Sequence, residues 1–184
     1  GGSQTVVTDG GYFGGKFSYV YMKRFIGEES TFASMMPIIK GLIHRFNPRH
    51  VGVDYGGGLD RNDDLIREFG ITRIVRYQYA GNKKLYFDNS LTRWMVNRTE
   101  ALMAFINAVN RGNEMEFPKW ESWEHPFAQD LLSVFKEYNE SRRCIQVNRT
   151  PGTTDDTLHS MLYCFLASMV VHPRHDILAP DKER

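Results

Sequence analysis

Acidic residues occur at two distant places in the sequence where an ionised carboxylate is unfavourable unless a ligand or another group stabilises its charge. Asp54 ends the short apolar run 50–54 and precedes the glycines 56–58, while Asp155 and Asp156 stand at the start of the last apolar segment. Burial at a strand end and repulsion between neighbouring carboxylates both destabilise the charged form, unless a divalent cation lies between them. Carboxylate oxygens suit Mg²⁺ or Mn²⁺. The pattern predicts a metal site that joins Asp54 to Asp156 and Asp155, and a pair that caps a helix N-terminus is the alternative for residues 155 and 156.

Two further residues are candidates for the same chemistry. His159 follows Asp155 by four residues, on the same helical face, where an imidazole contacts a metal ion or a phosphate. A histidine satisfied inside the core is the alternative that we prefer. Asp9 follows two valines in the segment TVVTDGG and is a candidate metal ligand on a strand. Because Asp-Gly favours a turn, a turn residue is the preferred interpretation of Asp9.

One glycine-rich segment is similar in sequence to a nucleotide-binding loop. Residues 10–17 read GGYFGGKF, close to the pattern G-x-x-x-x-G-K-[ST]. Phe17 stands where that loop needs a hydroxyl for Mg²⁺, and a strand is expected where a helix N-terminus is needed. We therefore exclude a P-loop in this chain.

The overall charge excludes a strongly basic protein, but part of the chain is locally basic. The formal net charge is +1, whereas residues 40–98 contain 11 Lys and Arg against 6 Asp and Glu. Such a stretch suits contacts to a nucleic-acid backbone, although solvated surface charge explains most single lysines. The cations that we expect to contact DNA phosphates are Lys83, Lys84, Arg61, Arg98, Arg143, Arg149 and His159.

Strand and helix signals alternate along the chain and must position these residues. Aromatic and β-branched runs predict strands at 5–8, 17–25, 50–54, 73–79 and 144–147. Apolar residues at i, i+3, i+4 and i+7 predict helices at 32–46, 59–69, 90–111, 127–138 and 154–171. A hairpin followed by alternating units predicts an α/β fold with a mixed central sheet flanked by helices. The site is expected at the carboxyl ends of central strands, including the strand that ends at Asp54.

Length and composition predict a single domain. The chain has 184 residues, of which 41% are apolar, so it can bury a core without staples. We expect one domain at 1–171 and a poorly ordered tail at 172–184. The two cysteines exclude a disulfide framework, and no segment approaches the length of a membrane span. We expect a soluble protein of a reducing compartment that does not bind membranes.

Several spaced motifs resemble those of one known family. The segments MKRFIGEES, HVGVDYGGGLDRNDDLIREFG, VNRTEALMAFINAV, FPKWESWEHPFAQDLL and TTDDTLHSMLYCFLAS occur in this order. Together they resemble the C-terminal nuclease domain of tailed-bacteriophage terminase large subunits, over residues 5–171. The resemblance implies an RNase H-like fold and a divalent-metal-dependent endonuclease that cuts concatemeric double-stranded DNA when genome packaging starts and ends. It also implies the host cell cytoplasm as location and, as partners, DNA, the portal, the small terminase subunit and the protein's own ATPase domain.

The resemblance assigns roles to the acidic residues. Asp54 matches the family's second acidic ligand, and Asp155-Asp156 matches the acidic start of the last helix, with Asp156 as the preferred ligand. The family's first acidic residue precedes a Ser-x-Thr-Val segment, which residues 3–6 match, so the first Asp and its strand are expected before Gly1. In the competing alignment, TVVTDGG resembles the first strand of ribonuclease H and Asp9 is the first ligand. Two metal ions about 4 Å apart are expected between these carboxylates.

Two other functions stay open at this point. One is a DNA- or portal-docking module with an incomplete metal site, and the other is a ribonuclease H-type hydrolase of RNA–DNA hybrids. No Ser, Cys or His nucleophile is expected, because phosphoryl transfer at two metal ions needs none.

Overall fold

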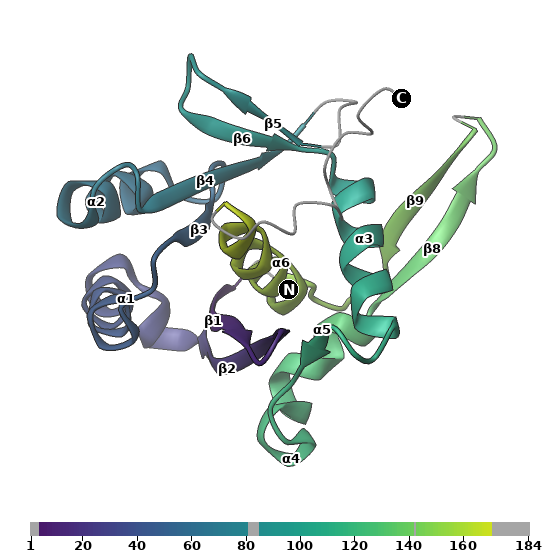
Figure 1. The fold of residues 1–184 in the computed structure, drawn as a ribbon, viewed down its shortest axis with the longest axis horizontal. Helices are drawn as coiled ribbons and strands as arrows, with labels where there is room; N and C mark the ends of the chain where they lie inside the picture. The colour runs from purple at the N-terminus through teal and green to yellow at the C-terminus, as the bar shows by residue number, and fades with distance from the viewer. Residues whose placement is uncertain (1–3, 81–84, 142, 171–184) are drawn as a thin grey trace.

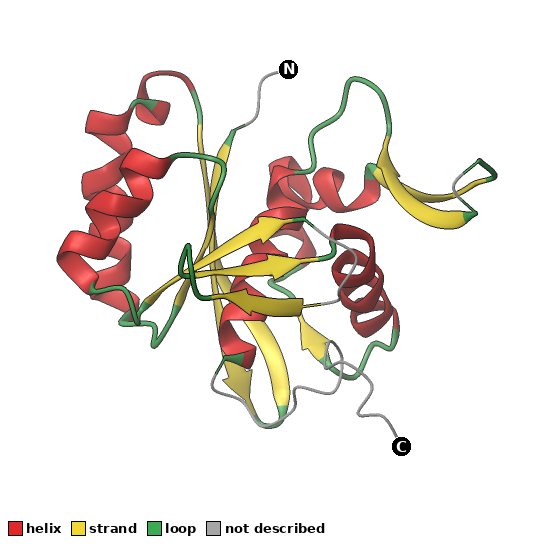
Figure 2. Ribbon diagram, turned by 90° about the horizontal axis from the view of Figure 1, so that it is seen from above, coloured by secondary structure: helices red, strands yellow, loops and turns green. Residues whose placement is uncertain are grey.

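The computed structural model describes residues 4–80, 85–141 and 143–170. It is a mixed α/β structure in which helices flank the strands (Figures 1 and 2). The helices are α1 (Phe32–Phe46), α2 (Leu59–Phe69), α3 (Arg98–Asn110), α4 (Trp120–Trp123), α5 (Gln129–Leu132) and α6 (Asp156–Met169), with the short helical turns η1 (Gly27–Ser30) and η2 (Glu124–Ala128). The expectation of an α/β fold with helices flanking mixed sheets is confirmed, but the described strands do not form the single mixed central sheet that was expected.

The described strands form three sheets. The first has the order β1-β2-β7 and the second the order β3-β4-β6-β5, and the third is the hairpin β8-β9. The bounds are β1 (Thr5–Phe13), β2 (Lys16–Phe25), β3 (Val51–Asp54), β4 (Ile74–Tyr79), β5 (Leu85–Asp88), β6 (Arg93–Val96), β7 (Met115–Glu116), β8 (Val134–Asn139) and β9 (Cys144–Arg149).

The β1–β2 hairpin is longer than the sequence predicts. β1 was expected to end at residue 8, but it continues to Phe13 with a bulge between Asp9 and Gly10. The turn consists of Gly14 and Gly15, which both adopt positive φ. Gly10 lies in the strand, where its backbone approaches β2 closely. A Cβ at this position would lie 2.8 Å from the Ser18 carbonyl oxygen, so only glycine allows the two strands to approach this closely.

The four-stranded sheet contains an element that the sequence did not predict as a strand. β3, β4 and β6 are parallel, and β5 pairs with β6 in the antiparallel direction. The expected helix 90–111 is therefore wrong at its start: residues 93–96 form β6, and α3 begins only at Arg98, after an N-cap at Asn97. Pairing of β6 with both β4 and β5 outweighs the local helix signal.

The β8–β9 hairpin projects from the body of the protein (Figure 1). Its first strand replaces most of the helix expected at 127–138, of which only Gln129–Leu132 is α-helical. That helix ends at Ser133, whose hydroxyl oxygen lies within hydrogen-bond distance of the carbonyl oxygens of Asp130 and Thr154. The expected strand 144–147 is confirmed and extends to Arg149.

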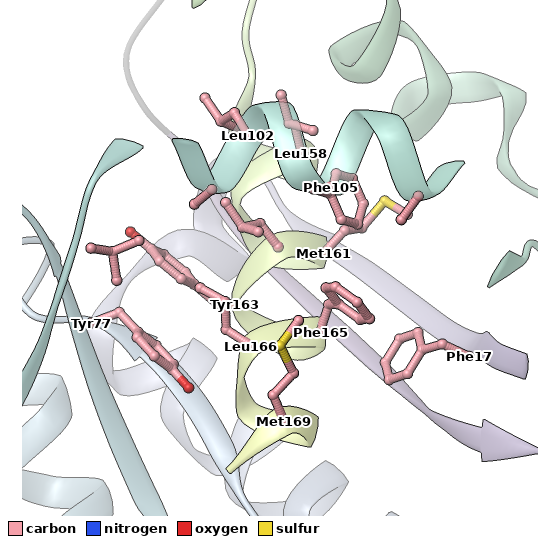
Figure 3. Packing of buried hydrophobic residues seen from close by; sticks show 14 of the residues in the cluster. Phe17, Tyr77, Leu102, Phe105, Leu158, Met161, Tyr163, Phe165, Leu166 and Met169 are labelled. Atoms are coloured by element: carbon pink, nitrogen blue, oxygen red, sulfur yellow. The ribbon is translucent and has the colours of Figure 1, made fainter. Parts of the chain in front are cut away.

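The core is built around α6. Apolar side chains of α6 pack against α3, against β2 and against β4 (Figure 3). The largest fully buried members of this cluster are Phe17, Tyr77, Val96, Leu102, Phe105, Leu158, Met161, Leu162 and Leu166. A second cluster joins α1 and α2 to the other face of the β3–β4 pair. The sheet that carries Asp54 is therefore packed on both faces, with α6 on one side.

A cavity separates two strand edges. β1 and β3 are each the terminal strand of their sheet, and they do not pair with each other. Between them lies a cavity of about 1290 Å³, lined by residues 5–10 of β1, by all of β3 and by Ser160 and Cys164 of α6. α6 contacts both strands, and it approaches β3 so closely that a Cβ on Gly52 would lie 2.4 Å from the Tyr163 carbonyl oxygen.

β1 begins at the end of the cavity where β3 finishes. Arg61 follows the loop after β3, and its Nη1 donates to Thr5 Oγ1 at 3.0 Å. The Gln4 amide donates to Asp156 Oδ2 at 2.9 Å. The start of β1, the end of β3 and the N-terminus of α6 therefore meet at one end of the cavity, and β1 runs away from it while β3 runs toward it.

Candidate functional site

Asp54 is held at the end of β3 by its own backbone and by the glycine loop that follows. The buried Asn62 donates from Nδ2 to the Asp54 carbonyl oxygen at 2.9 Å. The Gly56 amide faces the carboxylate, with 3.4 Å between its nitrogen and Oδ1. A Cβ on Gly57 would lie 2.7 Å from Oδ2. The loop therefore leaves the carboxylate a space that only glycine at position 57 allows.

The environment of Asp54 differs from the expectation in one respect. We predicted a buried central strand, but β3 is an edge strand and Asp54 is exposed. Among the described strands, β3 pairs only with β4. Its other edge faces the cavity, which explains why Asp54 is exposed.

Asp156 is the first residue of α6 and lines the same cavity as Asp54. The α6 N-terminus is fixed by Asp130, whose Oδ2 accepts from the Thr157 amide at 2.8 Å. Asp130 is itself buried and paired with Arg24 at 2.5 Å. Because this anchor satisfies an amide of the first turn, Asp156 is positioned without having to cap its own helix.

Asp155 has a different role from its neighbour. It occupies the N-cap position but makes no side-chain cap bond. Instead its carboxylate lies 3.0 Å from Arg149 Nη1, 3.2 Å from Arg98 Nη2 and 3.1 Å from His159 Nε2. The hydrogen bond from His159 and the charges of His159, Arg149 and Arg98 lower the pKa of Asp155 to about 2, against the opposing effect of burial. Asp155 is therefore ionised and surrounded by cations.

Four of the predicted cationic side chains line the cavity beside Asp54 and Asp156: Arg61, Arg98, Arg149 and His159. The side chains of Arg98 and Arg149 are 36% and 44% exposed, so both can still reach an anion while Asp155 orients them. The structure thus brings together carboxylates and cations from β3, α2, α3, β9 and α6, as a site that binds a metal and a phosphate requires.

Three other predicted cations are not part of this cluster. Arg143 lies at the tip of the β8–β9 hairpin, exposed and with a φ of 49°. Lys83 and Lys84 lie outside the described residues.

Asp9 lines the cavity but is separated from the Asp156 end. The preferred interpretation of Asp9 as a turn residue is wrong, because it lies within β1. Burial raises its pKa, with the Gly10 backbone hydrogen bond opposing. Asp9 follows Gln4 by five strand residues, or about 17 Å of extended chain, and only the Gln4 end of β1 contacts Asp156. The structure does not bring Asp9 to the other two carboxylates.

The donor set fits a divalent cation only in part. Asp54 and Asp156 offer hard oxygen ligands to one cavity, and the room around Asp54 suits a bound ion. Among residues 4–80, 85–141 and 143–170, however, no three His, Cys, Asp or Glu side chains are grouped closely enough to hold a metal.

Sequence reasoning missed two residues that support the site. Tyr163 donates from its hydroxyl to Asp54 Oδ1 at 3.4 Å. It lies seven residues after Asp156, two turns along the same helical face, and this spacing is the signal that was available. Asp130 was assigned to a helix without a role, and no local signal marks it as the anchor of α6.

Comparisons with known proteins identify no relative of this chain. No protein-family model matches the chain, and neither a curated protein nor a solved structure does. In the part of the chain that the structure describes, no helix has the length and apolarity to cross a membrane. The chain is thus a mixed α/β protein in which Asp54 and Asp156 line one cavity together with Arg61, Arg98, Arg149 and His159.

Proposed function

We propose that this chain is a divalent-metal-dependent endodeoxyribonuclease with an RNase H-like fold, the nuclease domain of a DNA-packaging terminase. The observation that carries the proposal is the placement of Asp54 and Asp156 at one cavity with Arg61, Arg98 and Arg149. Carboxylates for a metal and guanidinium groups for phosphates are the two requirements of phosphodiester cleavage. The motif resemblance names the substrate as concatemeric double-stranded DNA, and the portal, small subunit and ATPase domain as partners.

Each side chain has a defined task in this proposal. Asp54 and Asp156 would hold Mg²⁺ or Mn²⁺, which when bound supplies an activated water and neutralises charge at the phosphate. Arg98 and Arg149 would hold the DNA backbone beside the carboxylates. Asp155 keeps both guanidinium groups in place through bonds of 3.2 and 3.0 Å. Recognition is expected to depend on phosphates rather than on bases.

The open edges of β1 and β3 support a sheet with one more strand. An extended segment in the cavity would pair with β1 on one side and β3 on the other, and would merge the two sheets into one mixed sheet. A segment that finishes where β1 starts would run antiparallel to β1 and parallel to β3. Its last residue would then lie beside Asp54 and Asp156, where the family resemblance expects the first acidic residue. We propose that this strand supplies the missing ligand.

A docking module without catalysis is the second candidate. The observation that favours it is that, among the described residues, no three His, Cys, Asp or Glu side chains are grouped closely enough to hold a metal ion. Such a module would bind DNA through the same arginines but would not cut it.

Plasmid cleavage separates these functions. This chain and a version extended at its N-terminus by one strand are incubated with supercoiled plasmid and Mn²⁺, Mg²⁺ or EDTA, and with an RNA–DNA hybrid. We expect the extended version to nick and linearise plasmid with Mn²⁺ or Mg²⁺ only, and to lose this activity in Asp54→Asn and Asp156→Asn but not in Asp9→Asn. DNA binding without cleavage by either version would favour the docking module, and preference for the hybrid would favour a ribonuclease H-type enzyme.

A further inference from the structure

Tyr163 connects the protein interior to the Asp54 carboxylate. Its side chain comes from α6 and is only 7% exposed. Its hydroxyl donates to Asp54 Oδ1 at 3.4 Å. A buried hydroxyl needs a hydrogen-bond partner, and here the Tyr79 hydroxyl and the carboxylate proposed to bind metal are both within reach. This contact thus reaches one of the two oxygens of Asp54 from inside the fold.

The ring of Tyr163 is fixed by two other tyrosines. It stacks on Tyr77 with ring centres 5.6 Å apart and an interplanar angle of 4° (Figure 3). It also stacks on Tyr79 at 5.6 Å and 28°. Tyr77 and Tyr79 alternate with Gln78 along β4, so both rings project from the same face of that strand. Stacked rings on a paired strand leave the Tyr163 hydroxyl few alternative positions.

A second chain of contacts leads from this stack to the arginines. The Tyr79 hydroxyl lies 2.7 Å from His159 Nδ1, and His159 Nε2 lies 3.1 Å from Asp155 Oδ2. The Asp155 carboxylate can only accept hydrogen bonds, as it does from two guanidinium groups, so His159 donates to it from Nε2. The stack therefore touches Asp54 at one end and the cation cluster at the other.

The geometry points to Tyr163 as a positioning residue that orients the Asp54 carboxylate for a divalent cation. The inference rests on the proposed metal site, and it assigns to the tyrosine hydroxyl a role beyond packing. Groups that hydrogen-bond to a metal ligand restrict its orientation, and their loss weakens metal binding while the ligand itself stays in place. Removal of the Tyr163 hydroxyl should therefore weaken the binding of a cation without unfolding the protein.

Tyr77 is the matched control for Tyr163. Both rings are buried in the same stack, but the Tyr77 hydroxyl has no hydrogen-bond partner among the described residues and so makes no hydrogen bond to Asp54, although the two residues are register partners on β4 and β3. Tyr77→Phe and Tyr163→Phe each remove one hydroxyl oxygen from the same aromatic cluster, and in the described part of the chain only the Tyr163 hydroxyl of the two has hydrogen-bond partners, Asp54 and Tyr79. A hydroxyl that matters only for packing would give the two variants the same properties.

The test is titration of the protein with Mn²⁺ alone, with free Mn²⁺ followed by electron paramagnetic resonance and folding checked by thermal melting. We expect Tyr77→Phe to bind with the wild-type Kd, Tyr163→Phe to bind about three- to tenfold more weakly, and Asp54→Asn to lose the site. Raising the Mn²⁺ concentration should restore DNA cleavage to Tyr163→Phe of the strand-extended protein but not to Asp54→Asn.

Two results would contradict the inference, and they differ in meaning. A wild-type Kd in a folded Tyr163→Phe, together with loss of binding in Asp54→Asn, would overturn the role of Tyr163 and leave the metal site intact. Absence of Mn²⁺ binding in both this chain and the strand-extended protein would overturn the proposed metal site, and the inference with it.

Discussion

The backbone amide of Gln4 donates a hydrogen bond of 2.9 Å to Oδ2 of Asp156. This contact joins the start of β1 to the start of α6, 152 positions later in the chain. A strand that is followed directly by Gln4 would therefore end close to Asp156. The relationship explains why one additional strand in the cavity would bring a third ligand to the two carboxylates already present.

The space beside Asp54 predicts the effect of a single methyl group. A Cβ on Gly57 would lie 2.7 Å from Asp54 Oδ2, closer than side chains pack, whereas a Cβ on Gly56 would lie 4.0 Å away, at ordinary contact distance. We expect Gly57→Ala to displace the carboxylate and to weaken Mn²⁺ binding by about tenfold or more, while Gly56→Ala binds like the wild type. Titration of both variants with Mn²⁺ checks this, and equal affinities would show that the glycine loop does not shape the site.

The buried pair Arg24–Asp130 should carry much of the stability near α6. Both side chains are at most 10% exposed, and Asp130 also accepts from the Thr157 amide and the Thr154 hydroxyl. We expect Asp130→Ala to lower the free energy of unfolding by about 3–5 kcal/mol, because it removes the carboxylate that balances a buried guanidinium charge.

The matched control for that pair is the exposed pair of Lys23 and Glu29, whose carboxylate side chain is 51% exposed. Glu29→Ala should cost less than about 1 kcal/mol. Urea unfolding of both variants provides the comparison. Similar costs in the two variants would contradict the anchoring role of Asp130.

The low pKa of Asp155 predicts that the free energy of unfolding falls in acid. Its pKa is about 2 in the folded protein instead of the ordinary 3.8, chiefly because His159 hydrogen-bonds to it. A pKa that is lower in the folded state adds stability that is complete above the unfolded value and disappears as the pH falls through the folded value. The wild type should therefore lose about 2 kcal/mol of this contribution between about pH 5 and pH 1. Asp155→Asn should lack that part of the pH dependence in urea unfolding, and parallel curves for the two proteins would contradict the prediction.

Gly41 offers a prediction independent of the site. It lies in α1, is exposed, and a Cβ there would have no heavy atom within 4 Å. Alanine favours a helix interior over glycine, so Gly41→Ala should raise the free energy of unfolding by about 0.5–1 kcal/mol. A thermal melt checks the direction of the change, and a lower melting temperature would mean that α1 tolerates no side chain at this position.

Local patterns predicted the elements that depend on local interactions. α2 has the bounds 59–69 expected from its apolar spacing and its terminal Gly70, and the position of Asp54 at a strand end follows from the run that precedes it. β6 and β8 were assigned to helices, because their strand state depends on partners distant in the sequence.

The candidate site was predictable in part for the same reason. Arg61, Arg98 and Arg149 were selected as cations near predicted acidic residues, and the fold gathers them at one cavity. The bonds of Asp155 to Arg98 and Arg149 come from three separate elements, and no spacing in the sequence reveals them. The difference between Asp155 and Asp156 therefore became visible only in three dimensions.

The central proposal is that the carboxylates of Asp54 and Asp156 bind divalent cations at one shared site. The most direct measurement is an anomalous difference map from a crystal of the strand-extended protein soaked in Mn²⁺. The account predicts manganese peaks at about 2.0–2.4 Å from carboxylate oxygens of both residues, with a third ligand from the added strand. A map without manganese at either carboxylate, while DNA cleavage in solution requires Mn²⁺, would contradict it.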